Sequence, residues 1–136
     1  MATNEGRVYF ALDGDNFNPN ELSNFLGITP TSIKLKGDTV PGKVPKHNSW
    51  ILSSENIIYE YIDVFKMASD ICKTLEPKTE LIIKAMEKFN ITSRLEVVLT
   101  ISTEEQTSTP AIGFESDTVR FLGKVGASID IDTYKH

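Results

Sequence analysis

The chain has 136 residues, of which 40% are hydrophobic and 24% charged, and its formal net charge at pH 7 is -5. These values are typical of a globular protein and exclude a disordered chain, and no apolar run approaches the roughly 20 residues of a membrane span. We therefore expect one domain over residues 1–136. The acidic balance disfavours nucleic acid and membrane surfaces as partners and favours basic proteins.

The N-terminal residues and the cysteine content bear on the compartment. The chain begins Met-Ala-Thr-Asn-Glu-Gly-Arg, without the apolar segment of a secretory signal. Cys72 is the only cysteine, so no internal disulfide can form. It shares a helical register with Ala68 and Leu75, which predicts a buried thiol. We expect a cytoplasmic protein.

The first third of the chain predicts a strand, a helix and a second strand. Residues 7–12 are rich in Val, Tyr and Phe and end at a turn. Asn18 is a suitable N-cap for a helix that begins at Pro19 and stops at Gly27. Residues 28–36 then end in alternating apolar and lysine side chains, which predicts a strand with one wet face.

The middle of the chain predicts one strand and two helices. After a Gly- and Pro-rich loop over 37–48, residues 49–52 form a short strand with Trp50, which we expect in the core. Ser53 and Ser54 can cap a helix whose apolar positions run from Ile57 to Leu75. Pro77 breaks this helix, and a further helix follows over 79–89, with Asn90 as its left-handed C-terminal residue.

The last third predicts strand, helix, strand. Residues 93–103 are dense in β-branched side chains and are followed by a polar loop over 104–109. Residues 110–114 are expected to be extended, and Ser116 caps a helix that stops at Gly126. Residues 127–134 alternate isoleucine and aspartate, which predicts a half-buried strand with an acidic outer face.

The resulting order, β-α-β-β-α-α-β-α-β, predicts the fold class. We expect an α+β, ferredoxin-like layered fold with one mixed or antiparallel sheet of about five strands and helices on one face. The other face of the sheet would be left to solvent or to a partner.

Several short motifs carry a resemblance to a known family. They are Tyr9-Phe10-Ala11-Leu12 with Gly14-Asp15, Leu26-Gly27-Ile28-Thr29-Pro30-Thr31, Ser49-Trp50, Thr109-Pro110-Ala111-Ile112, Gly126-Ala127 and Ile129-Asp130-Ile131-Asp132. In combination they resemble the uncharacterised bacterial family catalogued as domain of unknown function 4279, over essentially the whole chain. The family has no established activity. Because small bacterial domains of this kind often sit beside toxin genes, the resemblance implies an immunity role by analogy.

Acidic residues form the strongest candidate site. If the first and last strands are neighbours, Asp13 and Asp15 lie near Asp130 and Asp132, with Glu104 and Glu105 on the adjoining loop. Like charges close together destabilise a sheet unless a hard cation or basic residues of a partner neutralise them. The alternative is that the first pair caps a turn while the second pair is solvated.

A basic loop is the second candidate. It carries Lys34, Lys36, Lys43, Lys46 and His47. Without a glycine-rich phosphate motif these residues predict a solvated loop or a partner-binding arm.

The residues for catalysis are few. The two histidines, His47 and His136, and the single cysteine offer neither a nucleophilic triad nor zinc-ligand spacing. We therefore expect no enzyme, no catalytic residue, no metal ligand and no cofactor.

The sequence thus favours a non-enzymatic protein-binding module. Most concretely, it would be a cytoplasmic immunity protein that neutralises a contact-dependent or polymorphic bacterial toxin by direct binding. The partner would be a basic toxin, bound through Asp13, Asp15, Glu104, Glu105, Asp130 and Asp132. The alternative is a small-ligand or metal-binding domain that uses the same acidic face, and a homodimer through the sheet is a third possibility.

Overall fold

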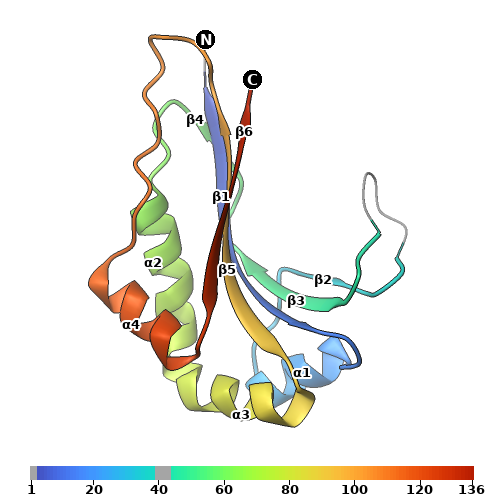
Figure 1. Ribbon diagram of the computed structural model, residues 1–136. Helices are drawn as coiled ribbons and strands as arrows, with labels where there is room; N and C mark the ends of the chain where they lie inside the picture. Colours follow the sequence, from blue (N-terminus) through green and yellow to red (C-terminus); the bar gives the residue numbers. More distant parts are fainter. Residues whose placement is uncertain (1–2, 39–43) are drawn as a thin grey trace.

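The described part of the chain forms one mixed sheet of six strands with helices packed on one side (Figure 1). The computed structural model describes residues 3–38 and 44–136. The strands are β1 (Asn4–Gly14), β2 (Ser32–Lys34), β3 (Asn48–Ser53), β4 (Ile57–Tyr59), β5 (Thr92–Ile101) and β6 (Ser128–Lys135). The helices are α1 (Pro19–Leu26), α2 (Val64–Leu75), α3 (Thr79–Phe89) and α4 (Ser116–Lys124), with a 3-10 turn (Glu76–Lys78) between α2 and α3.

The sheet order is β2-β3-β1-β5-β6, and β4 pairs with the start of β1. All neighbours are antiparallel except β5 and β6, which are parallel. Strands β1, β2, β3 and β5 therefore make the antiparallel sheet of a β-α-β-β-α-β fold, and α4 with β6 adds a parallel strand at its edge. This confirms the predicted fold class, with β4 as an additional strand.

The first and last strands are not neighbours, because β5 lies between them. The adjacency on which the acidic-cluster hypothesis depended is therefore wrong. A parallel β5-α4-β6 crossover places the last strand next to the strand that precedes it in the chain, and β1 already has β5 on that side.

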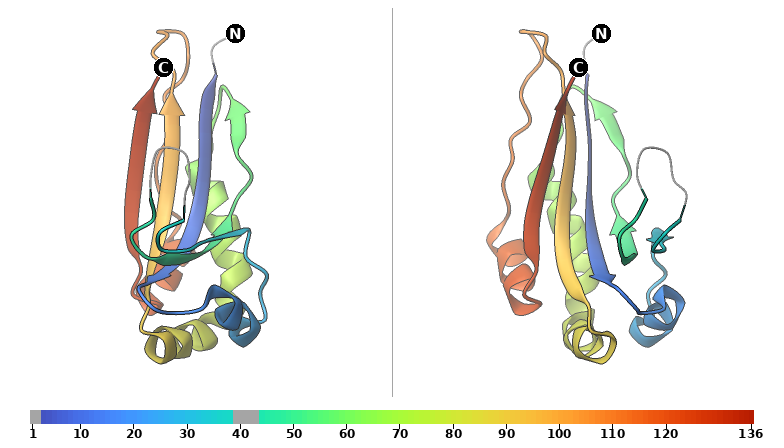
Figure 2. Two further views of the ribbon diagram at one scale, coloured as in Figure 1. Left: turned by 90° about the vertical axis from the view of Figure 1, so that its right-hand side faces the viewer. Right: turned by 45° about the vertical axis from the view of Figure 1, so that its right-hand side comes forward.

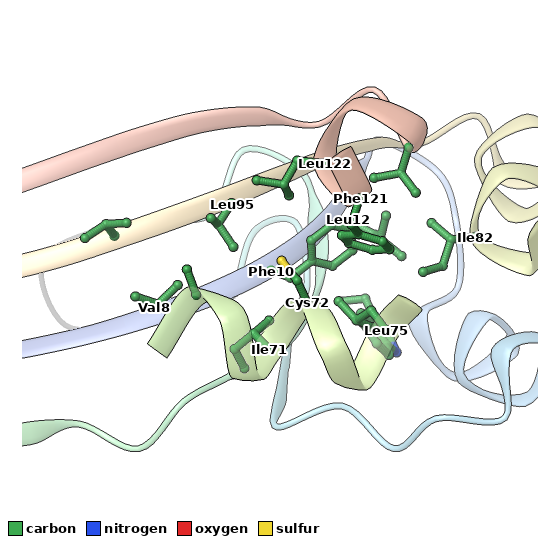
Figure 3. Packing of buried hydrophobic residues seen from close by; sticks show 14 of the residues in the cluster. Val8, Phe10, Leu12, Ile71, Cys72, Leu75, Ile82, Leu95, Phe121 and Leu122 are labelled. Atoms are coloured by element: carbon green, nitrogen blue, oxygen red, sulfur yellow. The ribbon is translucent and has the colours of Figure 1, made fainter. Parts of the chain in front are cut away.

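The core lies between the sheet and the helices and follows the period-two alternation of the strands. In Figure 3, Phe10 and Leu12 of β1 and Leu95 of β5 point toward Cys72 of α2 and Phe121 of α4. Each fully buried large side chain of this kind stabilises the fold by about 1.5–3 kcal/mol.

Two predicted core residues are confirmed. Cys72 is buried, and Trp50 is fully buried with its indole Nε1 donating to Ser23 Oγ at 3.0 Å. This hydrogen bond of Trp50 links β3 to α1 and satisfies the one polar atom of the indole.

The caps that the sequence indicates are mostly present. Asn18 caps α1 by accepting from Asn20 N at 2.9 Å, and Gly27 ends the helix with φ of 69°. Asn90 ends α3 in the left-handed region with φ of 53°. Ser116, however, is the first residue of α4 and makes no capping bond there.

The predicted start of the long second helix is wrong. Residues 57–59 form strand β4, which pairs with residues 4–6 of β1, and the helix begins at Val64 with Asp63 as N-cap. The first apolar side chains of the predicted helical stripe, Ile57, Ile58 and Tyr61, are exposed. They are β-branched or aromatic, so their composition suits a strand as well as a helix.

Other boundaries shift for identifiable reasons. β2 is limited to residues 32–34 because Pro30 has no N–H to donate and Leu35 N turns toward Asp38 Oδ2 at 3.1 Å. β1 is longer than predicted and includes Gly6, where a Cβ atom would lie 2.8 Å from Leu99 Cδ2. Residues 110–114 contribute one bridge, Ala111 to Asp63, rather than a strand.

The helix-free face of the sheet is partly overhung. The chain between β2 and β3, of which residues 35–38 and 44–47 are described and which we call the arm, projects in front of β1 and β5 (Figure 2, left). Gly37 N donates to Pro45 O at 3.1 Å and joins the two sides of the arm.

Two further features concern the helices and the chain ends. No described helix has the length and apolar character needed to cross a bilayer. Both ends of the chain lie at the same end of the sheet (Figure 1), where His136 Nε2 is 3.0 Å from Thr3 O.

Candidate functional site

A groove of about 730 Å³ lies between the arm and the helix-free face of the sheet. The strands position its floor, because alternate residues of β1, β3, β5 and β6 point away from the core. The groove is lined by Tyr9, Lys34, Val44, Pro45, Lys46, His47, Ser49, Ile51, Arg94, Glu96, Asp130 and Asp132. It therefore combines an apolar floor at Tyr9 and Ile51 with charged walls.

Arg94 organises the charges on the floor of this groove. Its Nε donates to Asp13 Oδ2 at 3.0 Å and its Nη1 donates both to Tyr9 OH at 3.2 Å and to Glu96 Oε1. Its guanidinium carbon also lies 5.5 Å from the centre of the Tyr9 ring. Burial disfavours the charged guanidinium, but hydrogen bonds to Asp13 and Tyr9 outweigh burial and raise the pKa of Arg94.

Asp13 is held on its other side by β3 and the arm. Ser49 Oγ donates to Asp13 Oδ1 at 2.6 Å, and His47 Nε2 lies 3.5 Å from the same oxygen. The register pairs Asp13 with Ser49, so this contact follows directly from strand alignment. Asp13 is thus a member of an internal ion-pair network rather than an unpaired acid.

Glu96 is a buried carboxylate next to two further carboxylates. It is 2% exposed, and the parallel register places it opposite Asp130 of β6. Its Oε1 accepts from Arg94, whereas Oε2 is buried without a hydrogen-bond partner among the described residues. Burial raises the pKa of Glu96 to about 7, with Asp132 and Asp130 adding to the rise and Arg94 opposing it.

The three carboxylates of Glu96, Asp130 and Asp132 come together at one point. One oxygen from each lies within 4.8 Å of the others, and no other group of three or more His, Cys, Asp or Glu ligands forms in the part of the chain that the structure describes. We call these residues the carboxylate trio. Within the same residues, neither Asp130 nor Asp132 makes an ion pair with a lysine, arginine or histidine.

The six acidic residues predicted as the binding site separate into different places. Asp130 and Asp132 lie together on β6, while Asp13 is part of the Arg94 network across β5. Asp15 is exposed in the turn after β1. Glu104 and Glu105 lie at the opposite end of β5 and β6, since the neighbouring Thr103 N donates to His136 O at 2.9 Å.

The basic loop joins the groove in part. Lys34, Lys46 and His47 line it, whereas Lys36 N, on the same stretch, donates to Asn48 Oδ1 at 2.7 Å. Lys43 lies outside the described residues.

Sequence reasoning missed Arg94 and Glu96. Both lie in β5, which the sequence predicted from its dense β-branched pattern. They alternate along this strand with Ser93, Leu95 and Val97, which are buried. The signal that could have revealed Arg94 and Glu96 is a pair of charged residues two positions apart in an otherwise apolar strand. This spacing places both charges on one face of the sheet.

Comparison with known proteins agrees with the motifs. A family model described as Domain of unknown function (DUF4279) matches residues 4–136. Searches of the curated proteins and of the solved structures found no significant match. The match spans every described helix and strand and extends to the end of the chain. The chain therefore belongs to the DUF4279 family of domains of unknown function.

Proposed function

We propose that this chain is a non-enzymatic protein-binding module, and most concretely an immunity protein that acts in the cytoplasm and neutralises a bacterial toxin by direct contact. The observation that carries the proposal is the uncovered sheet face, which ends in the acidic strand β6. Asp130 and Asp132 on this strand have no cationic partner among the described residues, so a basic partner can supply one.

The edge of β6 supports the same function. Among the described strands this one pairs only with β5, which leaves the backbone groups on its outer side available for hydrogen bonds to an added strand. Ile129 and Ile131 are 42% and 41% exposed, and Tyr134 is exposed beside them. Exposed apolar side chains next to an unpaired edge are typical of a surface that another protein covers.

The charge of this edge favours a basic partner over a second copy of the chain. Two β6 strands in contact would bring aspartates of both copies close together, and like charges opposite each other destabilise strand pairing. A toxin surface rich in lysine and arginine would instead be attracted, and the attraction would speed association at low salt.

The proposal gives the predicted residues different roles. Asp130 and Asp132 are the central contacts, Asp15 lies at the rim, and Asp13 acts inside the protein by holding Arg94. Glu104 and Glu105 extend the acidic surface at the far end of the strands.

The test uses the toxin candidate encoded next to this chain in its own genome. Co-expression should restore growth of cells that express the toxin, and the purified proteins should form a stoichiometric complex whose association slows as salt rises. Asp130→Asn with Asp132→Asn should slow association more than the matched control Glu80→Gln with Glu87→Gln, two exposed glutamates of α3.

The proposal fails if the neighbouring product neither binds nor is neutralised, or if the β6 variant and the α3 control slow association equally. Light scattering of the chain alone checks the homodimer, which would appear as a doubled mass.

A second candidate function, small-ligand or metal binding on the same face, is supported by the groove and the carboxylate trio. Calorimetry distinguishes this second function from toxin binding. Only small-ligand or metal binding predicts a saturable signal from a small ion or molecule when no partner protein is present.

A further inference from the structure

We infer that Glu96, Asp130 and Asp132 bind one hard divalent cation of the calcium type. The inference rests on the second candidate function, not on the toxin proposal, and goes beyond the sequence-based prediction, which assigned no metal ligand. The ligands come from adjacent parallel strands, with Glu96 on β5 and the two aspartates on β6.

The spacing of the oxygens suits calcium. Two oxygens that bind the same Ca²⁺ at about 2.3–2.6 Å can be at most about 4.6–5.2 Å apart. One oxygen from each member of the carboxylate trio lies within 4.8 Å of the others, so small side-chain adjustments bring all three to one such ion. Mg²⁺ demands near-ideal octahedral geometry at about 2.0–2.1 Å and gives up its water reluctantly, whereas Ca²⁺ accepts a flexible arrangement of ligands.

The second, independent observation is the orphaned oxygen of Glu96. A buried carboxylate oxygen normally accepts a hydrogen bond, because without one it loses its interaction with water and gains nothing in return. Glu96 Oε2 has no such partner among the described residues, although the side chain is 3% exposed. A cation between Glu96, Asp130 and Asp132 would satisfy this oxygen and remove the repulsion among the three charges.

The surrounding charges are consistent with a divalent ion. The carboxylate trio and the Arg94 guanidinium that touches Glu96 together carry a formal charge of -2. Lys34, at the end of β2, and Lys46 of the arm line the same groove, but among the described residues neither makes an ion pair with these carboxylates.

The ligand set also selects against softer metals. All three protein ligands are carboxylate oxygens, which suit calcium, magnesium and manganese rather than zinc or copper. Water would complete the coordination, because the groove is open to solvent and calcium takes about 6–8 oxygen ligands.

The experiment is isothermal titration calorimetry of the full chain after chelator treatment, at pH 8, with CaCl₂ and, in separate runs, MgCl₂. The expected result is saturable binding of one Ca²⁺ per chain below about 1 mM, with Mg²⁺ weaker. Asp130→Asn, Asp132→Asn and Glu96→Gln should each weaken Ca²⁺ binding by about tenfold or more.

Glu80→Gln with Glu87→Gln serves as the matched control, because it removes two exposed charges from α3 and leaves the carboxylate trio intact. It should bind Ca²⁺ as the wild type does. Thermal unfolding gives a second readout, since Ca²⁺ should raise the midpoint of the wild type and the control but not that of Asp130→Asn.

Absence of saturable heat at millimolar Ca²⁺ would overturn the inference, as would equal affinity in the wild type and the trio variants. Either outcome leaves the toxin proposal standing if the complex still forms in chelator. Conversely, Ca²⁺ binding without a toxin complex would retain the metal site and remove the immunity function.

Discussion

Arg94 is the side chain on which the charged face depends, because one guanidinium is shared by carboxylates of two strands. It joins Asp13 of β1 to Glu96 on its own strand and stacks near Tyr9. The sequence pattern predicted that Asp130 and Asp132 share one face of β6, but the predicted half-buried isoleucine face is wrong, because Ile129 and Ile131 are exposed. The pattern could not predict the pairing of Arg94 with Asp13, because that contact requires β1 and β5 to be aligned so that Ala11 faces Arg94.

Arg94→Met tests this network. The variant keeps an unbranched apolar stem but removes the guanidinium, which leaves Asp13 and the buried Glu96 without their shared cation. We expect urea denaturation to show a loss of about 3 kcal/mol in the free energy of unfolding, the low end for breaking a buried pair, because the Arg94 side chain is 26% exposed.

The control is Arg120→Met, which breaks an exposed pair with Asp117 and should change the stability by less than about 0.5 kcal/mol. Adding Glu96→Leu to Arg94→Met should recover part of the loss, since the buried Glu96 carboxylate is then no longer left without its cation. Equal and small effects at both arginines would show that the network contributes nothing to stability.

Cys72 allows a second prediction at this scale. Burial raises the pKa of its thiol to about 12 from the ordinary 9.0, which lowers the thiolate fraction at pH 8 by about a thousandfold. The native protein should therefore resist iodoacetamide at pH 8, whereas the protein in denaturant should be alkylated, as mass spectrometry can measure. Rapid labelling of the native protein would place Cys72 outside the core.

At the scale of elements, the helices and strands with a strong period and a clear stop signal were predicted well. Trp50 on β3, the left-handed Asn90 after α3 and the alternation of β5 are examples. The segment before α2 was not predicted, because Ile57, Ile58 and Tyr61 fit a helical spacing while their residue types suit a strand as well. What decides between them is the partner: β4 pairs with the first residues of β1, a contact across more than fifty residues of chain that no local pattern encodes.

Asp63→Ala tests where α2 begins. The Asp63 carboxylate accepts from Lys66 N at 3.0 Å, so its removal should lower the free energy of unfolding by about 1 kcal/mol. Asp63→Asn keeps an accepting oxygen and should therefore lose only part of this free energy of unfolding. Ser116→Ala, at the start of α4 where no capping bond forms, should be neutral within about 0.5 kcal/mol. A neutral Asp63→Ala would place the helix start elsewhere.

At the scale of the whole molecule, the layered α+β class followed from the order of elements, but the neighbours of each strand did not. Inserting β5 between β1 and β6 divides the predicted acidic cluster: Asp13 pairs with Arg94, while Asp130 and Asp132 join Glu96. The candidate site was therefore half predicted. Asp130 and Asp132 could be predicted from the sequence as polar positions of a strand. The buried Glu96 could not be recognised as part of the site until the register placed it opposite Asp130.

The position of the chain ends has a mechanical consequence. β1 begins and β6 finishes at the same end of the sheet, and both are bonded to β5. A force that separates the two ends of the chain acts across the strands, so it loads the hydrogen bonds of each ladder one after another from that end. The sheet therefore unzips under tension at a lower force than if its strands had to slide past one another.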